Sequence, residues 1–239
     1  MERNPFPLLR PFAPVLDTAL FGKEDNATDE DVRRTMTTTS AVALKQVHGG
    51  RAVLARQAMN RTSKVSSGSW QGIARTVEAD AAATDQPGLA LTVRTADCQS
   101  FLVFCPDPLV IGVIHAGWKG LLAGIIPSLF DLLWEEWNIR PEGTYVCAGP
   151  SLCKECAEFS NPKAELRGIS PRFFEGRRAD LRAIAEDQLW NIGVQEHRFK
   201  RHGDCTKCSS RTWWSYRGGD REAVEKGSTN FLACVLRGE

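Results

Sequence analysis

The sequence predicts an α+β fold in a single domain that covers residues 1–239. Strand-like apolar runs and helical patterns alternate irregularly along the chain, whereas a doubly wound fold repeats them regularly. Neighbouring apolar runs also form hairpin-like pairs: residues 101–105 and 110–114 flank a tight turn at residues 106–108. The chain contains neither an internal repeat nor a linker that would divide it.

Apolar runs bounded by glycine, proline or polar clusters predict the strands. They occupy residues 14–16, 41–44, 51–56, 81–84, 101–105, 110–114, 144–148, 194–199 and 231–236, and a further run begins at Leu91. Residues 213–216 are interpreted as an aromatic strand or loop. The Ser-rich residues 60–72 are expected to form a surface loop.

Helical periodicity and capping residues predict helices at residues 29–36, 117–137 and 180–191. Asp29 and Asp180 are the expected N-caps, because a carboxylate there accepts from the free N–H groups of the first turn. Gly193 is the expected stop of the third helix. Pro127 should kink the second helix or delay its start, because proline lacks the N–H that a helix interior requires.

The composition favours a soluble, cytoplasmic protein. The chain carries 30 Lys and Arg against 29 Asp and Glu, a formal net charge of +1, so it offers no electrostatic attraction to nucleic acid or to an anionic membrane. Residues 121–133 form the most apolar stretch, which is too short to span a membrane. Residues 1–10 contain charges and prolines where a signal peptide has an apolar core. The eight cysteines are therefore expected to be reduced.

Two residues beside the central hairpin are suited to metal binding or to catalysis. Cys98 precedes the run at residues 101–105 and His115 follows the run at residues 110–114, so both should lie near one edge of a sheet. A thiolate and an imidazole there suit either a metal ion or a nucleophile with its base. His48, on a glycine-bounded turn, adds a third ligand of the kind that zinc and copper prefer. The plainer interpretation is a buried cysteine and two hydrogen-bonded histidines.

Short sequence blocks make a family resemblance specific. They are KQVHG at residues 45–49, EADAAAT at 78–84, TADC at 95–98, HAGWKG at 115–120, GPSL at 149–152 and WWSYR at 213–217. In this order they resemble the signature blocks of the laccase-domain family, whose members are known as polyphenol oxidases and purine nucleoside phosphorylases. The resemblance implies a single domain of mixed β-sheets layered with α-helices. It also implies one metal ion, usually zinc with copper as the alternative, bound by His48, Cys98 and His115.

Cationic side chains are the candidates for binding substrate phosphate. Lys119 lies where the helix at residues 117–137 begins, and Arg217 closes the WWSYR block. A phosphate dianion in a partly dry site needs charge-assisted hydrogen bonds and is favoured by the free N–H groups of a helix start. Family members carry an arginine block near the N-terminus that is not found here. The resemblance therefore transfers their active-site arginine to Arg34.

Carboxylates are the candidates for orienting the metal ligands and for moving protons. Asp97, next to Cys98, is expected to accept from a metal-bound histidine and is counted with Cys98, His48 and His115 among the catalytic residues. Asp97 or Glu78 would move the proton in a deamination.

Two Cys-x-x-Cys pairs form a second constellation, at Cys153 and Cys156 and at Cys205 and Cys208. Each spacing suits half of a structural zinc site with four cysteines. The interval between the pairs is much longer than in a zinc ribbon. The alternative is a set of redox-sensitive surface thiols.

Three functions compete. The resemblance implies a zinc enzyme that cleaves adenosine, inosine or methylthioadenosine with phosphate and that also deaminates adenosine. A copper-dependent polyphenol oxidase ranks lower, because four histidines are too few for a multicopper cluster. The third is a Cys–His hydrolase that edits murein precursors, with Cys98 as nucleophile, His115 as base and Asp97 or His48 as orienter. Metal content separates the first from the third, because Cys98 bound to zinc is not free to attack.

Overall fold

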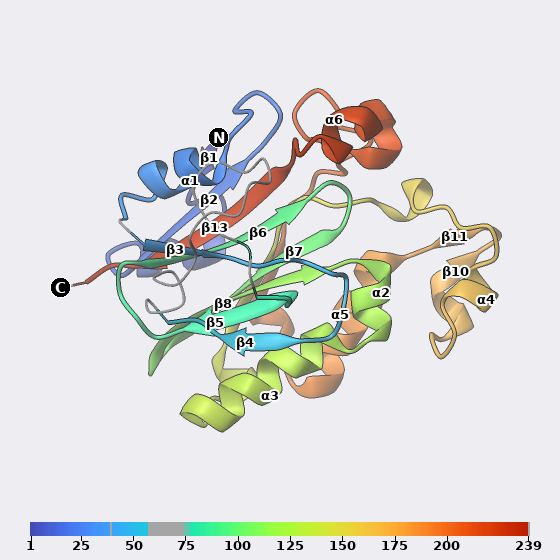
Figure 1. Cartoon of the computed structure of the whole chain (residues 1–239). Helices are drawn as coiled ribbons and strands as arrows, with labels where there is room; N and C mark the ends of the chain where they lie inside the picture. The colour runs from blue at the N-terminus through green and yellow to red at the C-terminus, as the bar shows by residue number, and fades with distance from the viewer. Residues whose placement is uncertain (39, 57–74, 76, 239) are drawn as a thin grey trace.

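The computed structural model describes residues 1–38, 40–56, 75 and 77–238, and its elements are built around two β-sheets (Figure 1). The expected loop at residues 60–72 lies outside the described residues. One sheet has five strands, in the order β1 (Glu2–Arg3), β2 (Leu16–Phe21), β13 (Asn230–Leu236), β6 (Leu89–Thr95) and β3 (Ser40–Ala43). The other has six, in the order β12 (Phe199–Arg201), β9 (Tyr145–Ala148), β7 (Gln99–Pro106), β8 (Leu109–Ala116), β5 (Ala81–Thr84) and β4 (Ala52–Leu54).

Both sheets combine parallel and antiparallel pairs. β13 pairs antiparallel with β2 and with β6, whereas β3 is parallel to β6. β7 is antiparallel to β8 and β9, whereas β4 and β12 join the second sheet as parallel strands. A separate small hairpin is formed by β10 (Phe174–Glu175) and β11 (Arg178–Ala179). The predicted α+β class with mixed sheets is confirmed.

Helices cover the outer faces of the two sheets (Figure 1). α1 (Asp29–Thr35) packs on the five-stranded sheet, and α3 (Ile125–Trp137) and α5 (Leu181–Ile192) pack on the six-stranded sheet. The shorter helices are α2 (Trp118–Leu122), α4 (Pro162–Glu165) and α6 (Arg221–Glu225). Single turns are η1 (Pro7–Phe12), η3 (Pro141–Gly143), η4 (Lys154–Cys156), η5 (Pro171–Phe173), η6 (Glu196–Arg198) and the π-helical η7 (Tyr216–Asp220). Among the described residues, no helix has both the length and the apolar character needed to cross a membrane.

β7 shows why its sequence is apolar without interruption. Leu102 and Phe104 belong to the core between the sheets, which also contains Leu232 of β13. Phe101 and Val103 point to the opposite face and pack in the core beneath α3 and α5. Because both faces of the strand are covered, residues 99–105 are all buried, and each large apolar side chain among them contributes about 1.5–3 kcal/mol to stability.

The predicted long helix at residues 117–137 is two helices. Gly124 has a φ of 73°, in the left-handed region, and separates α2 from α3. Glycine adopts this conformation without the steric cost that a Cβ brings. Pro127 lies in the first turn of α3, where its missing N–H has no intrahelical partner to lose, so it neither kinks nor delays the helix.

Helix caps agree with the prediction at one helix and differ at another. Asp180 accepts from the Ala183 N–H and caps α5, as expected. The cap of α1 is Thr28 instead of Asp29, because Thr28 and Asp31 satisfy each other's backbone N–H groups in a capping box.

One predicted strand is corrected, and a segment predicted as strand or loop is a loop. The strand expected at residues 194–199 is wrong over most of its length, because residues 196–198 form η6 and β12 begins only at Phe199. The apolar Val194 donates to the Leu189 carbonyl and packs in the core below α5, so it completes that helix instead of starting a strand. Of the two alternatives for residues 213–216, the loop is confirmed at residues 213–215, and η7 begins at Tyr216.

Candidate metal centre and substrate pocket

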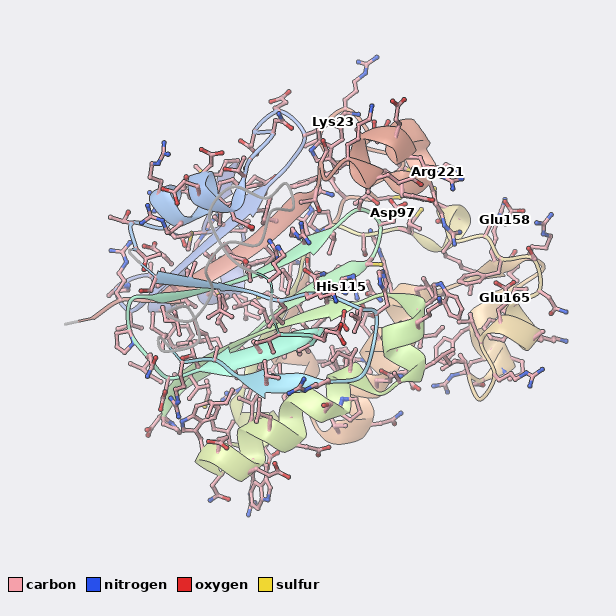
Figure 2. The ribbon with its side chains drawn as sticks, viewed as in Figure 1. Lys23, Asp97, His115, Glu158, Glu165 and Arg221 are labelled. Carbon is pink, nitrogen blue, oxygen red and sulfur yellow. The ribbon has the colours of Figure 1, made fainter. Side chains whose placement is uncertain are left out.

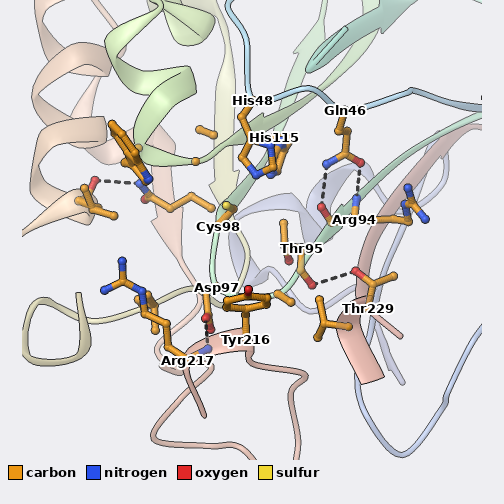
Figure 3. Close-up of a pocket in the computed structure, with 18 of the residues that line it drawn as sticks. Gln46, His48, Arg94, Thr95, Asp97, Cys98, His115, Tyr216, Arg217 and Thr229 are labelled. Atoms are coloured by element: carbon orange, nitrogen blue, oxygen red, sulfur yellow. Dashed lines mark hydrogen bonds between the residues drawn. The ribbon is translucent and has the colours of Figure 1, made fainter. Parts of the chain in front are cut away.

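His48, Cys98 and His115 converge in space although they are far apart in sequence (Figure 3). Cys98 lies immediately before β7, and His115 lies in β8 opposite Ser100 of β7. The two imidazole rings are 4.8 Å apart between centroids and nearly perpendicular. One nitrogen of each ring and the thiol sulfur all lie within 4.8 Å of one another. Cys98 and His115 thus lie close together at the end of the β7–β8 hairpin, as predicted, and the turn after β3 adds His48.

This donor set fits a zinc ion. Zinc takes imidazole nitrogen at about 2.0–2.1 Å and thiolate at about 2.3 Å, in a tetrahedron that catalytic sites leave open at one position. Three ligand atoms separated by less than 4.8 Å leave room for one such ion between them. His48 is exposed and all three residues line one cavity, so the cluster is accessible from solvent.

Asp80 fixes the geometry of the cluster, a role that the sequence assigned to Asp97. Its fully buried carboxylate lies 2.8 Å from His115 Nδ1 and accepts from the backbone N–H groups of Val47, His48 and Gly49. Burial alone would raise the pKa of Asp80, but these hydrogen bonds lower it, so the group is ionised at neutral pH. An ionised carboxylate only accepts, so His115 donates through Nδ1 and presents Nε2 to the centre.

The electrostatics of the cluster favour a thiolate. Burial raises the pKa of the Cys98 thiol, but His115 and His48 outweigh it and bring the pKa to about 6. Burial lowers the pKa of His115, but Cys98 and Asp80 outweigh it and raise the pKa to about 9. Cys98 is therefore deprotonated at neutral pH, which is the form in which a cysteine binds metal or attacks as a nucleophile.

Gly117 keeps the space beside the cluster open. A Cβ at this position would lie 2.9 Å from Cys98 Sγ and 2.9 Å from His48 Cδ2. Contacts this short would displace two of the three ligands. Glycine is therefore required here by the close approach and not by its backbone angle, because its φ of −75° suits any residue.

A cavity of about 540 Å³ opens onto the cluster (Figure 3). Its walls come from residues 94–99 between β6 and β7, residues 115–118 between β8 and α2, and the C-terminal residues 216–217 and 227–229. A volume of about 300–1,000 Å³ is typical of small-molecule sites. The metal-type cluster therefore lies at the wall of a pocket with room for a nucleoside-sized ligand.

Asp97 organises the wall opposite the histidines. Its carboxylate accepts from Thr206 Oγ1 at 2.8 Å, from Ser215 Oγ at 2.6 Å and from the Arg217 backbone N–H at 2.7 Å. Arg217 lines the cavity, and its guanidinium donates to the Glu158 carbonyl and lies 5.3 Å from the Phe159 ring centre. Figure 2 shows Asp97 and His115 in the middle of the molecule. Asp97 thus contacts the phosphate candidate Arg217 and not a histidine.

Three predicted residues do not line the cavity. Lys119 is exposed, with its ammonium 5.4 Å from the Trp118 ring centre. Arg34 lies on α1 with its side chain 71% exposed beside Glu30, because the N-terminal helix covers the far face of the five-stranded sheet. Glu78 is exposed and pairs with Lys45 at 2.7 Å. Of the three cationic residues predicted to bind substrate, Arg217 lines the cavity, whereas Lys119 and Arg34, like the proton-transfer candidate Glu78, lie outside its lining.

Two residues of the pocket were missed by the sequence interpretation. Arg94 lines the cavity. Burial lowers the pKa of Arg94 to about 10, with Arg75 adding to the effect and Asp29 opposing it. The side chain is still charged at neutral pH, so the pocket wall contains a second cation. Gln99 is 2% exposed and donates to the Leu181 carbonyl, and its Oε1 has no hydrogen-bond partner in the described part of the chain. The strand end at Thr95–Cys98 could have indicated both, since they flank that block.

The four cysteines of the Cys-x-x-Cys pairs also meet in space. Their sulfurs all lie within 4.8 Å of one another, and none of them is in a disulfide. None of these residues lines the cavity.

Comparison with known proteins agrees with this geometry. Residues 24–233 match the family described as multi-copper polyphenol oxidoreductase laccase. The chain is 33% identical over 131 residues to the purine nucleoside phosphorylase ORF3 of Streptomyces griseus, which covers 54% of this chain and 48% of that protein. It is 35% identical over 112 residues to a purine nucleoside phosphorylase of Deinococcus radiodurans, with 47% and 38% covered. The chain thus matches about half of the length of these relatives or less.

Solved structures share the fold. YlmD from Geobacillus stearothermophilus superposes with a TM-score of 0.77 at 23% identity, covering 96% of this chain and 94% of that one. The hypothetical protein YfiH of Bacillus licheniformis gives 0.74 at 23% identity, with 86% and 78% covered. The family match spans most of the sequence and includes the blocks that carry His48, Cys98 and His115. The chain belongs to the multi-copper polyphenol oxidoreductase laccase family.

Proposed function

We propose that this protein is a zinc-dependent purine nucleoside phosphorylase. The observation that carries the proposal is that a cluster with two imidazoles and one thiolate opens onto a cavity of about 540 Å³ whose wall contains Arg217. The related proteins named purine nucleoside phosphorylase support the choice of substrate. We further propose that residues 1–239 act as one domain, since β13 near the C-terminal end pairs with β2 and β6.

The ligands of the ion would be His48, Cys98 and His115, with Asp80 orienting His115. When bound, zinc supplies a Lewis acid that stabilises negative charge on a substrate oxygen. Arg217 would bind the phosphate through charge-assisted hydrogen bonds, and the buried Arg94 adds positive potential from the other wall. We assign Asp97 a positioning role, because its oxygens already accept from Thr206, Ser215 and the Arg217 N–H.

The reaction exchanges one bond for another at the anomeric carbon. A phosphate oxygen forms a bond to C1′ as the bond from C1′ to the purine nitrogen breaks. The bonding electron pair leaves with the base, which takes up a proton, and the products are free base and ribose 1-phosphate. Adenosine, inosine and methylthioadenosine all contain this bond. The ring of Tyr216 lines the cavity and offers an apolar surface for a purine.

The histidine count favours a single-ion centre over an oxidase that needs several copper ions. His197 and His202 are the two histidines outside the cluster. His197 lies in η6, and His202 lies 3.3 Å from Glu2 and stacks edge-on against Trp213. Neither adds a ligand to the centre. We therefore propose zinc as the native metal, and metal analysis decides between zinc and copper.

Adenosine deamination is the second candidate at the same centre. The supporting observation is the arrangement itself, since three protein ligands and one open position are typical of hydrolytic zinc sites. In that reaction water replaces the amino group at C6 of the purine, and the products are inosine and ammonia.

One assay separates these functions. Purified, zinc-loaded protein is incubated with adenosine in the presence and absence of phosphate, and the products are separated by chromatography. Adenine formed only with phosphate supports phosphorolysis, and inosine formed without phosphate supports deamination. Cys98→Ala should lose the zinc of the His48–Cys98–His115 centre together with activity, whereas the core variant Cys105→Ala should keep both. Absence of adenine and inosine, with cleavage of a murein precursor by metal-free protein, would instead identify the Cys–His hydrolase.

A further inference from the structure

The four cysteines of the second cluster come from two loops that lie next to the pocket wall. Cys153 precedes η4 and Cys156 is its last residue, after β9, and Cys205 and Cys208 follow β12. Cys153 Sγ lies 4.0 Å from Cys208 Sγ, and Cys156 Sγ lies 3.5 Å from it. Four thiolates around one tetrahedral zinc ion at about 2.3 Å are separated by about 3.8 Å. The two measured separations bracket this value.

Backbone N–H groups in both loops point at one of the sulfurs. The Cys153 N–H donates to Cys205 Sγ at 3.3 Å, and the Cys208 N–H donates to the same atom at 3.5 Å. A sulfur that accepts two N–H groups is stabilised as a thiolate, which is the form that binds metal. The backbone of the two loops is therefore arranged around this sulfur.

A disulfide, a packing role in the core and an iron–sulfur cluster all suit these four cysteines less well than a single zinc ion. A disulfide would join two cysteines and leave two without a role, and none of the four is in a disulfide. Three of the four are exposed or half-buried, so the group is not an ordinary part of the apolar core. A four-iron cluster attaches each thiolate to a different iron atom and would spread the sulfurs farther apart than the observed limit of 4.8 Å.

We propose that Cys153, Cys156, Cys205 and Cys208 bind one zinc ion as a closed, structural site that is separate from the His48–Cys98–His115 centre. All four positions of the tetrahedron are filled by protein sulfur, so this ion offers no open position for a substrate. Its role is to join two loops that also contact each other through hydrogen bonds and through an apolar cluster with Leu152 and Cys205. An isolated bridge pairs Ser151 with Cys205, and the Thr206 N–H donates to the Ser151 carbonyl.

The joined loops support the pocket through Asp97. Thr206, next to the ligand Cys205, donates to Asp97 Oδ1 at 2.8 Å. Leu152, next to the ligand Cys153, donates its N–H to the Asp97 carbonyl at 3.2 Å. Asp97 in turn accepts from the Arg217 N–H. The tetrathiolate site therefore holds the two segments that contact Asp97, and Asp97 in turn accepts from the backbone of Arg217.

The first test counts metal in the whole protein. Cys98→Ala removes a ligand of the first centre, so one zinc per chain should remain in this variant, bound to four sulfurs by X-ray absorption. Adding Cys156→Ala and Cys208→Ala to it should remove the remaining zinc, whereas adding Cys105→Ala should not. Iron in place of zinc, a disulfide found by mass spectrometry, or four freely alkylated thiols in Cys98→Ala would each overturn the proposal.

The second test measures local order instead of activity. Amide hydrogen exchange is compared between wild-type protein and Cys156→Ala/Cys208→Ala. Faster exchange is expected at residues 151–157 and 204–217, with no change in β7 and β8. Unchanged exchange at residues 204–217 would show that the site does not support the wall that carries Arg217.

Discussion

Replacing Asp80 by asparagine tests whether this buried carboxylate orients the metal centre. Asp80 Oδ1 faces His115 Nδ1 at 2.8 Å and the His48 N–H at 2.9 Å, and Oδ2 accepts from Gly49 at 2.7 Å and Val47 at 3.2 Å. An asparagine keeps one acceptor oxygen, but its NH₂ group would replace the other oxygen and face two N–H donors, so the hydrogen bonds of that oxygen would be lost. Each lost hydrogen bond to a charged group is worth about 1.5–3 kcal/mol.

The loss should appear in both zinc affinity and stability. Removing the acceptor of a metal-bound histidine typically costs about 10–100-fold in metal affinity, which corresponds to about 1.4 kcal/mol for each factor of ten. The assay is a zinc titration in competition with a chromophoric chelator, combined with denaturant unfolding of the metal-free protein. We expect weaker zinc binding and a lower free energy of unfolding for Asp80→Asn.

The matched control is Glu78→Gln, two residues away. Glu78 is exposed and pairs with Lys45, so its neutralisation should change neither quantity beyond the small contribution of a surface ion pair. An unchanged zinc affinity in Asp80→Asn, or an equal loss in Glu78→Gln, would refute the assignment of Asp80 as the orienting residue.

Three further changes have defined outcomes. Gly117→Ala places a Cβ 2.9 Å from Cys98 Sγ and should weaken zinc binding in the same titration, whereas Gly143→Ala, with nothing within 4 Å of its Cβ, should not. Arg217→Ala should raise the KM for phosphate by about tenfold or more, since a charge-assisted hydrogen bond is worth about 1.5–3 kcal/mol, while Lys119→Ala, outside the cavity, should leave it unchanged. Phe104→Ala should lower the free energy of unfolding by about 3–5 kcal/mol in a denaturant titration, because the ring is fully buried between the sheets. Equal effects in each pair of site variants, or a small loss at Phe104, would contradict these expectations.

Local sequence patterns were sufficient to predict the strands at the centre of the six-stranded sheet. The predicted strand at residues 81–84 is β5, and the turn between residues 101–105 and 110–114 joins β7 to β8. Because antiparallel pairing follows from a short turn, the approach of Cys98 to His115 could be predicted from the sequence. The break at Gly124 was missed because the apolar period continues across it, and only the left-handed φ at that glycine separates α2 from α3.

Long-range contacts could not be predicted in the same way. Choosing between Asp80 and Asp97 required knowing that the turn after β3 lies beside β5, a contact made through the bridge between Lys45 and Glu78. In the sequence Asp97 is adjacent to Cys98, whereas Asp80 is far from all three ligands, so proximity in sequence favoured Asp97. In the fold, the φ of Asp97 is 97°, and its carboxylate reaches residues of the C-terminal segment.

The contact of Asp97 with the C-terminal segment, instead of with a histidine, explains how two chemically different walls meet in one pocket. Asp97 and Cys98 are neighbours, yet the Cys98 thiol joins the histidines while the Asp97 carboxylate joins Thr206, Ser215 and Arg217. Asp97 and Cys98 lie in the bend before β7, where Asp97 has a left-handed φ, and their side chains contact the Arg217 backbone N–H and the histidine cluster respectively, so one dipeptide links the proposed metal ligands to the proposed phosphate-binding arginine. The proposed metal ligands and the proposed phosphate-binding arginine therefore both contact one covalently linked dipeptide, and the loops that carry Thr206 and Leu152 donate hydrogen bonds to its Asp97.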